Sequence, residues 1–233
     1  MRPKLATRWV VWAIAGEKGK DRLLQAVAQV SALRFARAVA GRSDNAVAGD
    51  RRIPSVSDSD VVASLAITLD GYVCREDGSV DYLEKYPIEE FDFADFVDGI
   101  GALIMGSTSY VQAVEWGWMW GDRPTMVLTT RRDLPIPDGA DIRFSSMPTP
   151  QAIRTFSAKT PMRLWVFGGG RVITDGLRGG AIDTLDVTVM PEAIGSGIPL
   201  FAEAYDGPLK LVETTAYANG AVRLVYDTRN ATQ

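Results

Sequence analysis

The chain has 233 residues, 46% of them apolar and 23% charged, so it can bury a sizeable core without disulfides or structural metal ions. It contains no histidine and a single cysteine, Cys74. These counts exclude a Ser-His-Asp triad, a Cys-His dyad, zinc sites built on histidine or on several cysteines, and an intramolecular disulfide. We therefore expect no metal site, a reducing cytoplasmic compartment and, for an enzyme, chemistry supplied by a bound cofactor.

Charge divides the chain into two parts. Residues 1–52 contain 11 Lys and Arg against 4 Asp and Glu, whereas residues 53–233 contain 14 against 25. Residues 53–60 are rich in Pro, Ser and Asp, which is typical of a linker. We predict a basic, poorly ordered extension and linker over residues 1–60 and one folded domain over residues 61–233. The apolar run over residues 9–15 is too short to cross a bilayer, so no membrane partner is expected.

From residue 61 onward, short apolar runs alternate with helical patterns. Residues 61–69 form a nearly continuous apolar run that ends at Asp70-Gly71, as expected of a central strand followed by a turn. Apolar residues then recur at helical spacing over residues 88–100, with Pro87 where a helix would begin, which predicts one helix. Residues 102–105 predict a short buried strand that closes at Gly106.

The second half of the domain repeats this alternation. Strands are predicted over 125–130, 164–167 and 185–190, and a helix over 150–158 with Thr149 as its N-cap. Residues 209–216 and 222–226 predict a hairpin around Asn219-Gly220, a dipeptide typical of tight turns. We therefore predict an α/β fold: a mixed, mostly parallel central sheet flanked by helices, with a C-terminal antiparallel hairpin.

Three predicted strand ends carry glycines, hydroxyls and guanidinium groups that suit phosphate. Glycines let a ligand approach the backbone, and a helix that begins there turns its free N–H groups toward an anion. Because ligands of open α/β sheets bind at the carboxyl ends of strands, the three turns together indicate a phosphate site, although each alone also fits an ordinary turn or helix cap. The turns are Gly106-Ser107-Thr108-Ser109, Thr129-Thr130-Arg131-Arg132 and Gly168-Gly169-Gly170-Arg171-Val172.

Six short segments occur in an order that is specific to one family. They are SLAITLDGYV (64–73), DGSVDYL (77–83), LIMGSTSY (103–110), PTMVLTTR (124–131), VFGGGRV (166–172) and IDTL followed by Pro191, GSG and PLF (182–201). Through them, residues 61–226 resemble the dihydrofolate reductase-like superfamily. The resemblance is greatest to the C-terminal reductase domain of the bifunctional riboflavin-biosynthesis deaminase–reductase and to its stand-alone relatives.

The resemblance implies an NADPH-dependent reductase that forms a homodimer. It places the triple-glycine turn at the diphosphate and nicotinamide side of the cofactor, Gly106 and Ser109 at a phosphate, and Thr130 and Arg131 around the adenosine 2′-phosphate. It also places Ala66 against the nicotinamide and Thr188 beside the substrate. The cofactor-binding residues so implied are Ala66, Gly106, Ser107, Ser109, Thr130, Arg131, Gly168, Gly169, Gly170, Arg171 and Val172.

Some residues depart from the family pattern. Ser107 stands where the family often has arginine, which removes one phosphate partner, and Tyr82 replaces the usual tryptophan. Trp116, Trp118 and Trp120 have no clear counterpart in the family. These tryptophans can be interpreted in three ways: as ordinary loop packing, as a lid on the substrate side, or as a contact surface between subunits.

Hydride transfer from a reduced nicotinamide requires no histidine, but a proton must still reach the product. Asp70 and Asp81 are the candidate catalytic residues for that step, because burial can raise the pKa of a carboxyl group towards neutrality. The carboxylates within residues 88–100, or water, are alternatives that the spacing does not separate.

The favoured function is the NADPH-dependent reduction of a small heterocycle, either 5-amino-6-(5-phosphoribosylamino)uracil, as in riboflavin biosynthesis, or a pterin. The acidic domain does not favour nucleic acid as a partner. One alternative is a nucleotide-binding family member with a different or lost activity, which is suggested by Ser107 at a position where the family often has arginine. Another is a binding module that uses the basic residues 1–52, for which strongly salt-dependent nucleic-acid binding is expected.

Overall fold

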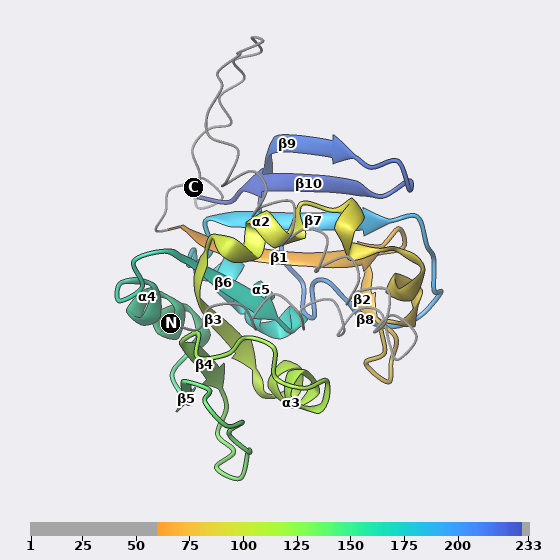
Figure 1. Ribbon diagram of the computed structural model, residues 1–233. Coiled ribbons are helices and arrows are strands. Elements are labelled where there is room, and N and C mark those ends of the chain that lie inside the picture. The colour runs from red at the N-terminus through yellow and green to blue at the C-terminus, as the bar shows by residue number, and fades with distance from the viewer. Residues whose placement is uncertain (1–59, 230–233) are drawn as a thin grey trace, which may run out of the picture.

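The computed structural model describes residues 60–229, whose arrangement Figure 1 shows. The extension and linker predicted over residues 1–60 lie, except for Asp60, outside the described residues and stay a prediction. Within the described range, no helix is long and apolar enough to cross a membrane. The same range contains no group of three or more His, Cys, Asp or Glu side chains that could hold a metal ion.

Two sheets and a set of short helices make up the described part of the chain. The main sheet contains β1 (Val61–Thr68), β3 (Ile100–Gly106), β4 (Thr125–Leu128), β5 (Ile142–Ser145), β6 (Arg163–Gly168), β7 (Thr184–Met190), β9 (Lys210–Ala216) and β10 (Val222–Asp227). A small second sheet pairs β2 (Tyr72–Cys74) with β8 (Ile198–Pro199). The helices are α2 (Phe93–Asp98), α3 (Ser107–Glu115), α4 (Thr149–Ser157) and α5 (Gly170–Arg178), with 3-10 turns η2 (Asp81–Lys85) and η3 (Ile88–Glu90).

The strand order of the main sheet is β5-β4-β3-β6-β1-β7-β10-β9. All pairs from β5 to β7 are parallel, whereas β10 is antiparallel to both of its neighbours. The carboxyl ends of the six strands from β5 to β7 therefore lie at one edge of the sheet, where β9 also ends. This architecture is dihydrofolate reductase-like and confirms the predicted fold class, including the antiparallel strands at the C-terminus.

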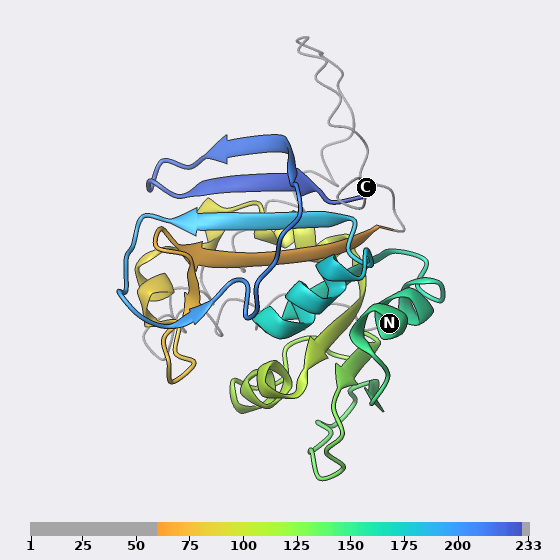
Figure 2. The same ribbon diagram turned by 180° about the vertical axis from the view of Figure 1, so that it is seen from behind.

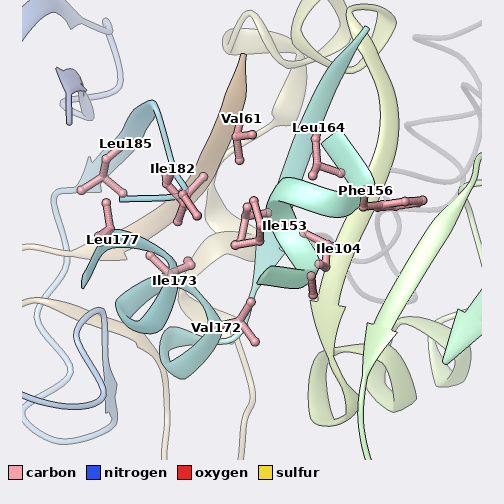
Figure 3. Close-up of a cluster of buried hydrophobic side chains, with 14 of the residues drawn as sticks. Val61, Ile104, Ile153, Phe156, Leu164, Val172, Ile173, Leu177, Ile182 and Leu185 are labelled. Atoms are coloured by element: carbon pink, nitrogen blue, oxygen red, sulfur yellow. The ribbon is translucent and has the colours of Figure 1, made fainter. Parts of the chain in front are cut away.

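Helices cover both faces of the sheet. The face toward the viewer in Figure 1, called the front face below, carries α2, and the back face carries α4 and α5, which Figure 2 shows from behind. Alternate side chains of the central strands enter two separate cores, because successive residues of a strand point to opposite faces. The back-face core, shown in Figure 3, includes Val61, Ile104, Ile153, Phe156, Leu164, Val172, Ile173, Leu177, Ile182 and Leu185.

The front-face core is aromatic. Its buried members include Leu103, Met105, Tyr110, Trp120 and Trp165. Phe93 and Phe96 of α2 cover Trp165 with T-shaped ring contacts, at centroid distances of 6.0 and 5.1 Å. The packing of α2 thus depends on the aromatic side chains of the strand beneath it.

The single helix predicted over residues 88–100 is wrong. The segment forms η3 and then the short α2, and the backbone is extended at Phe91, with φ −115° and ψ 156°. Tertiary contacts with the hairpin tip accompany the break: the Phe91 ring lies 4.8 Å from that of Tyr217, and Asn219 donates to Glu90 at 2.8 Å. These contacts override the helical periodicity of the segment.

The strands β2, β5 and β8 were not expected from the sequence. Strand β5 has four residues and lies at the edge of the sheet, paired with β4 on one side. Its two central residues, Arg143 and Phe144, are both exposed, so its side chains do not alternate between buried and exposed. The predicted hairpin is confirmed: Gly220 has φ +89°, and Asn219 Oδ1 accepts the N–H of Ala221 at 3.0 Å.

The back-face core can be tested with two isoleucines of opposite exposure. Ile104 is fully buried in β3 and Ile136 is 55% exposed in a loop. We expect Ile104→Ala to lower the free energy of unfolding by about 2–5 kcal/mol, because it removes buried apolar atoms and leaves a cavity. Ile136→Ala should change it by less than about 0.5 kcal/mol. Urea unfolding of both variants measures the difference; equal effects would contradict this core.

Candidate nucleotide site

Two helices begin side by side at the carboxyl edge of the sheet. Strands β3 and β6 are parallel neighbours with Met105 paired to Gly168, and each leads directly into a helix, α3 and α5 respectively. The N-cap residues are Gly106 and Gly169, and neither helix has a side-chain hydrogen bond at its cap. The first backbone N–H groups of both helices are thus available, and with the positive ends of two helix dipoles they suit a diphosphate.

The triple-glycine turn takes a shape that side chains would prevent. Gly168 has φ +136°, which other residues rarely adopt, and the Gly168–Gly169 peptide bond is cis. At Gly170 an added Cβ would lie 3.0 Å from the carbonyl oxygens of both Pro199 and Leu200. The start of α5 therefore packs directly on the chain at residues 199–200.

The other residues predicted for this part of the site lie against the same turn. A Cβ added to Gly169 would lie 3.5 Å from Ser109 Oγ, and one added to Gly106 would lie 3.3 Å from Val172 Cγ2. Ser107 is the first residue of α3. The structure thus brings together the Gly106 and Gly168 turns that the sequence singled out separately.

The Arg171 side chain is less suited to binding an anion than the sequence suggested. Its side chain is 78% exposed, and Nε lies 4.0 Å from a carboxylate oxygen of both Asp175 and Glu203. Two carboxylates near one guanidinium partly neutralise its attraction for a phosphate. The backbone of this turn is consequently better placed than the Arg171 side chain to hold the anion.

The predicted turn over residues 129–132 lies one strand further along the same edge. Leu128, the last residue of β4, pairs with Gly106, and the exposed Thr130 and Arg131 follow two and three residues later. The Arg131 N–H donates to Thr129 Oγ1 at 3.0 Å, and its guanidinium donates to Asp133 at 3.3 Å. The three turns therefore follow adjacent strands in the order β6, β3, β4.

The two residues expected beside the nicotinamide and the substrate are cross-strand partners. Ala66 of β1 pairs with Thr188 of β7, so both side chains point to the front face. Both are half-exposed. Strand β6 lies next to β1 on the other side, so this pair is adjacent to the glycine turns.

Asp70 holds two loop segments together through hydrogen bonds to its ionised carboxylate, which disfavours it as a proton donor. Its carboxylate accepts hydrogen bonds from Thr68 Oγ1 at 2.5 Å, from the Gly195 N–H at 2.8 Å and from the Ile194 N–H at 3.1 Å. These donors, Thr68 foremost, hold the pKa of Asp70 below its ordinary value of 3.8. The ionised carboxylate fastens the loop that follows β7 to the end of β1.

Asp81 is likewise engaged elsewhere. It forms an exposed ion pair with Arg75 at 2.6 Å, and this hydrogen bond lowers the pKa of the carboxyl group. Burial raises the pKa of neither acid above its ordinary value. The expectation that Asp70 or Asp81 supplies the proton is therefore not favoured by the geometry.

A second anchor for the loop after β7 was missed by sequence reasoning. Glu192 accepts hydrogen bonds from Lys85 Nζ at 2.9 Å and from the Tyr86 hydroxyl at 2.8 Å, and its backbone carbonyl accepts the N–H of Leu69. These partners lie more than 100 residues away in the chain. No local pattern around Glu192 could have indicated them.

The tryptophans of the loop after α3 pack against other side chains. Trp120 is buried against Trp165 and Phe167, at ring distances of 5.2 and 5.5 Å, and Trp118 packs on Tyr110. Within residues 60–229, the indole N–H of Trp120 has no hydrogen-bond partner. Loop packing is thus the interpretation that fits Trp118 and Trp120.

Comparison with known proteins places this arrangement in a family. The sequence model of the RibD C-terminal domain family matches residues 59–223 of this chain. This range includes all three turns and the Ala66–Thr188 pair. The chain belongs to the RibD C-terminal domain family. The uncharacterized Bacillus subtilis protein YwjB is 29% identical over 172 residues, with 71% of this chain and 95% of YwjB covered.

Solved structures share the fold of this RibD-type domain. A Shewanella protein whose name links it to riboflavin biosynthesis superposes with a TM-score of 0.62 at 23% identity, covering 72% of this chain and 98% of that one. Dihydrofolate reductase from Enterococcus faecalis, solved with NADP(H), superposes with a TM-score of 0.55 at 18% identity, covering 73% and 96% of the two chains. At these identities the likeness establishes the fold alone.

The carboxylate of Asp70 predicts a pH-dependent loop. Its pKa is lowered in the folded protein, so its stabilising effect is complete above the ordinary value of 3.8 and is lost as the pH falls further, through the lowered pKa. We expect the Ile194 and Gly195 amides to be more protected from hydrogen exchange in the wild type than in Asp70→Ala at about pH 5, with the difference shrinking by about pH 3. Equal protection at the higher pH would contradict the anchor.

Proposed function

We propose that the protein is an NADPH-dependent reductase of a small heterocycle, of the 5-amino-6-(5-phosphoribosylamino)uracil or pterin type, in the cytoplasm. The observation that carries the proposal is the pair of helices that start side by side on glycine N-caps, at the ends of β3 and β6. Membership of the RibD C-terminal domain family supports the choice of reduction over other nucleotide chemistry.

The residues present fit a dinucleotide. The backbone N–H groups that begin α3 and α5 would hold its diphosphate, and Thr130 and Arg131 would hold the adenosine 2′-phosphate. When bound, reduced nicotinamide supplies a hydride. The chain itself provides the small side chain of Ala66, against which a flat ring can lie, and the hydroxyl of Thr188 beside it.

The proton that completes the reduction is proposed to come from water. Asp70 and Asp81 are both exposed and both have lowered pKa values, so they are ionised at neutral pH and hold no proton to donate. The role of the protein is then to orient the substrate and the hydride donor, a contribution that geometry alone can make large.

Calorimetric titration of the full-length chain with NADPH tests the cofactor site. We expect a dissociation constant on the order of micromolar, and a loss of at least about tenfold in Gly169→Asp, which places a negative charge where the diphosphate would lie. Gly180→Asp is the matched control: it adds the same charge beyond the opposite end of α5, at an exposed glycine with φ +56°. Absence of NADPH binding by the wild type would overturn the reductase proposal.

Arg131 should separate NADPH from NADH. If its guanidinium holds the 2′-phosphate, Arg131→Ala loses a charge-assisted hydrogen bond and weakens NADPH binding about tenfold or more, while NADH binding stays the same. Arg132→Ala, at the adjacent exposed arginine, serves as the control. An equal loss for both nucleotides would place Arg131 elsewhere than at the 2′-phosphate.

We further propose that the chain forms a homodimer. Leu211 and Val212 on the edge strand β9 are 50% and 39% exposed, and they give this part of the surface an apolar character suited to a second copy. Light scattering should report about twice the chain mass of 25.3 kDa.

A further inference from the structure

A row of polar residues crosses the front face of the sheet next to the proposed nicotinamide position. The pairing of neighbouring strands aligns Ala66, Thr188, Arg223 and Thr215 on β1, β7, β10 and β9. Directly paired residues point to the same side of a sheet, so all four face the front. An adjacent row, two residues back along β7, adds Ser64, Asp186 and Glu213, with the buried Val225 of β10 between the last two.

Three charged side chains at the centre of this surface form one network. Arg223 donates to both oxygens of Asp186, at 2.9 and 2.8 Å, and to Glu213 Oε1 at 3.1 Å. The Asp186 side chain is 6% exposed and that of Arg223 25%. Burial works against the charged guanidinium, but the hydrogen bond and charge of Asp186, with the charge of Glu213, outweigh it and raise the pKa of Arg223.

Such a network is costly to place on a sheet. Taking charges out of water is expensive, and apolar residues of similar size are often as stable or more so. On the opposite face of β7, the side chains are apolar: Leu185 and Val187 are buried in the back-face core. The front face of β7 and β10 thus carries Asp186 and Arg223 next to the buried Val225, at positions where packing alone would favour apolar residues.

The residues around the network leave part of this surface half-open. Ser64, Thr188, Glu213 and Thr215 are all half-exposed. Apolar clusters flank them on the front face: one around Trp165 with α2, and one around Met190 that includes Ala66 and Tyr217. The polar residues of the two rows thus share the front face with two apolar clusters, an arrangement suited to a flat ring with a polar edge.

We propose that Glu213 and Arg223, with Thr188, determine the specificity of the substrate site by binding the amide or amidine edge of an uncharged heterocycle. The inference rests on the proposed function, since it places the ring next to the nicotinamide position at Ala66. The guanidinium N–H groups donate to a ring carbonyl, and the Glu213 carboxylate accepts from a neighbouring N–H or amino group. Asp186 is a positioning residue, because its two oxygens fix the guanidinium plane.

The charge balance excludes an anion at this place. Two carboxylates surround one guanidinium, which leaves one surplus negative charge. A phosphate group is therefore repelled here, and a phosphorylated substrate must place that group away from β9 and β10.

The test uses 5,6-diaminouracil as the probe, titrated into the full-length protein by calorimetry with and without NADPH. Glu213→Gln keeps the size of the side chain and removes its charge. We expect it to weaken probe binding about tenfold or more, while the NADPH dissociation constant stays within about twofold. Asp227→Asn, at a carboxylate paired with Arg229 near the far end of β10, is the matched control and should change neither. Inorganic phosphate should not compete with the probe.

Two further variants separate recognition from structural support. Arg223→Lys keeps the charge but loses the bidentate geometry, and Thr188→Val removes one hydroxyl at nearly constant size. Both should weaken the probe and leave NADPH binding unchanged. Equal probe affinity in the wild type and Glu213→Gln would overturn the inference, as would parallel losses of probe binding, NADPH binding and melting temperature.

The inference and the proposed function can fail separately. Wild-type protein that binds NADPH but not the probe overturns the inference alone. Wild-type protein that binds the probe in a Glu213-dependent way but does not bind NADPH supports the recognition surface and overturns the reductase proposal.

Discussion

The parallel pairing of β3 with β6 is the constraint on which the candidate site depends. Because Met105 and Gly168 are partners, α3 and α5 must begin within reach of one another. A side chain at Gly168 or Gly170 would alter the turn or collide with the carbonyls of Pro199 and Leu200. The candidate anion site thus depends on backbone direction and close packing, with side-chain charge secondary, as the exposed and partly neutralised Arg171 illustrates.

The carboxylates near the site contribute by holding the backbone in place. Asp70 and Glu192 lie on two loops at the same sheet edge, and each gathers donors from segments far away in the sequence. Asp70 fastens the loop after β7 to β1, and Glu192 ties that loop to η2. The loop between β7 and β8 is consequently positioned from two sides, next to the Ala66–Thr188 pair.

Sequence reasoning reached the fold and the three turns because both depend on local signals. Apolar runs that end in glycines and hydroxyls identify strand ends, and parallel order then predicts that those ends meet, as Gly106 and Gly168 do. The prediction of one helix over residues 88–100 is wrong because Phe91 packs against Tyr217 and Glu90 binds Asn219. These residues are distant in the sequence, so the periodicity of the segment cannot reveal the contacts. The hydrogen bonds of Asp70 could not be predicted for the same reason, since the N–H groups that bind it are 124 and 125 residues away.

The reversed direction of β10 divides the sheet into two regions that can change independently. From β5 to β7 every strand points its carboxyl end to the edge that carries the glycine turns, so a substitution there can affect these turns and the packing of the helices that follow. Strands β9 and β10 form the last hairpin of residues 60–229, and their front-face side chains can vary without moving a glycine turn. A gene encoding this fold can therefore vary the codons of β9 and β10 while those of the glycine turns stay fixed.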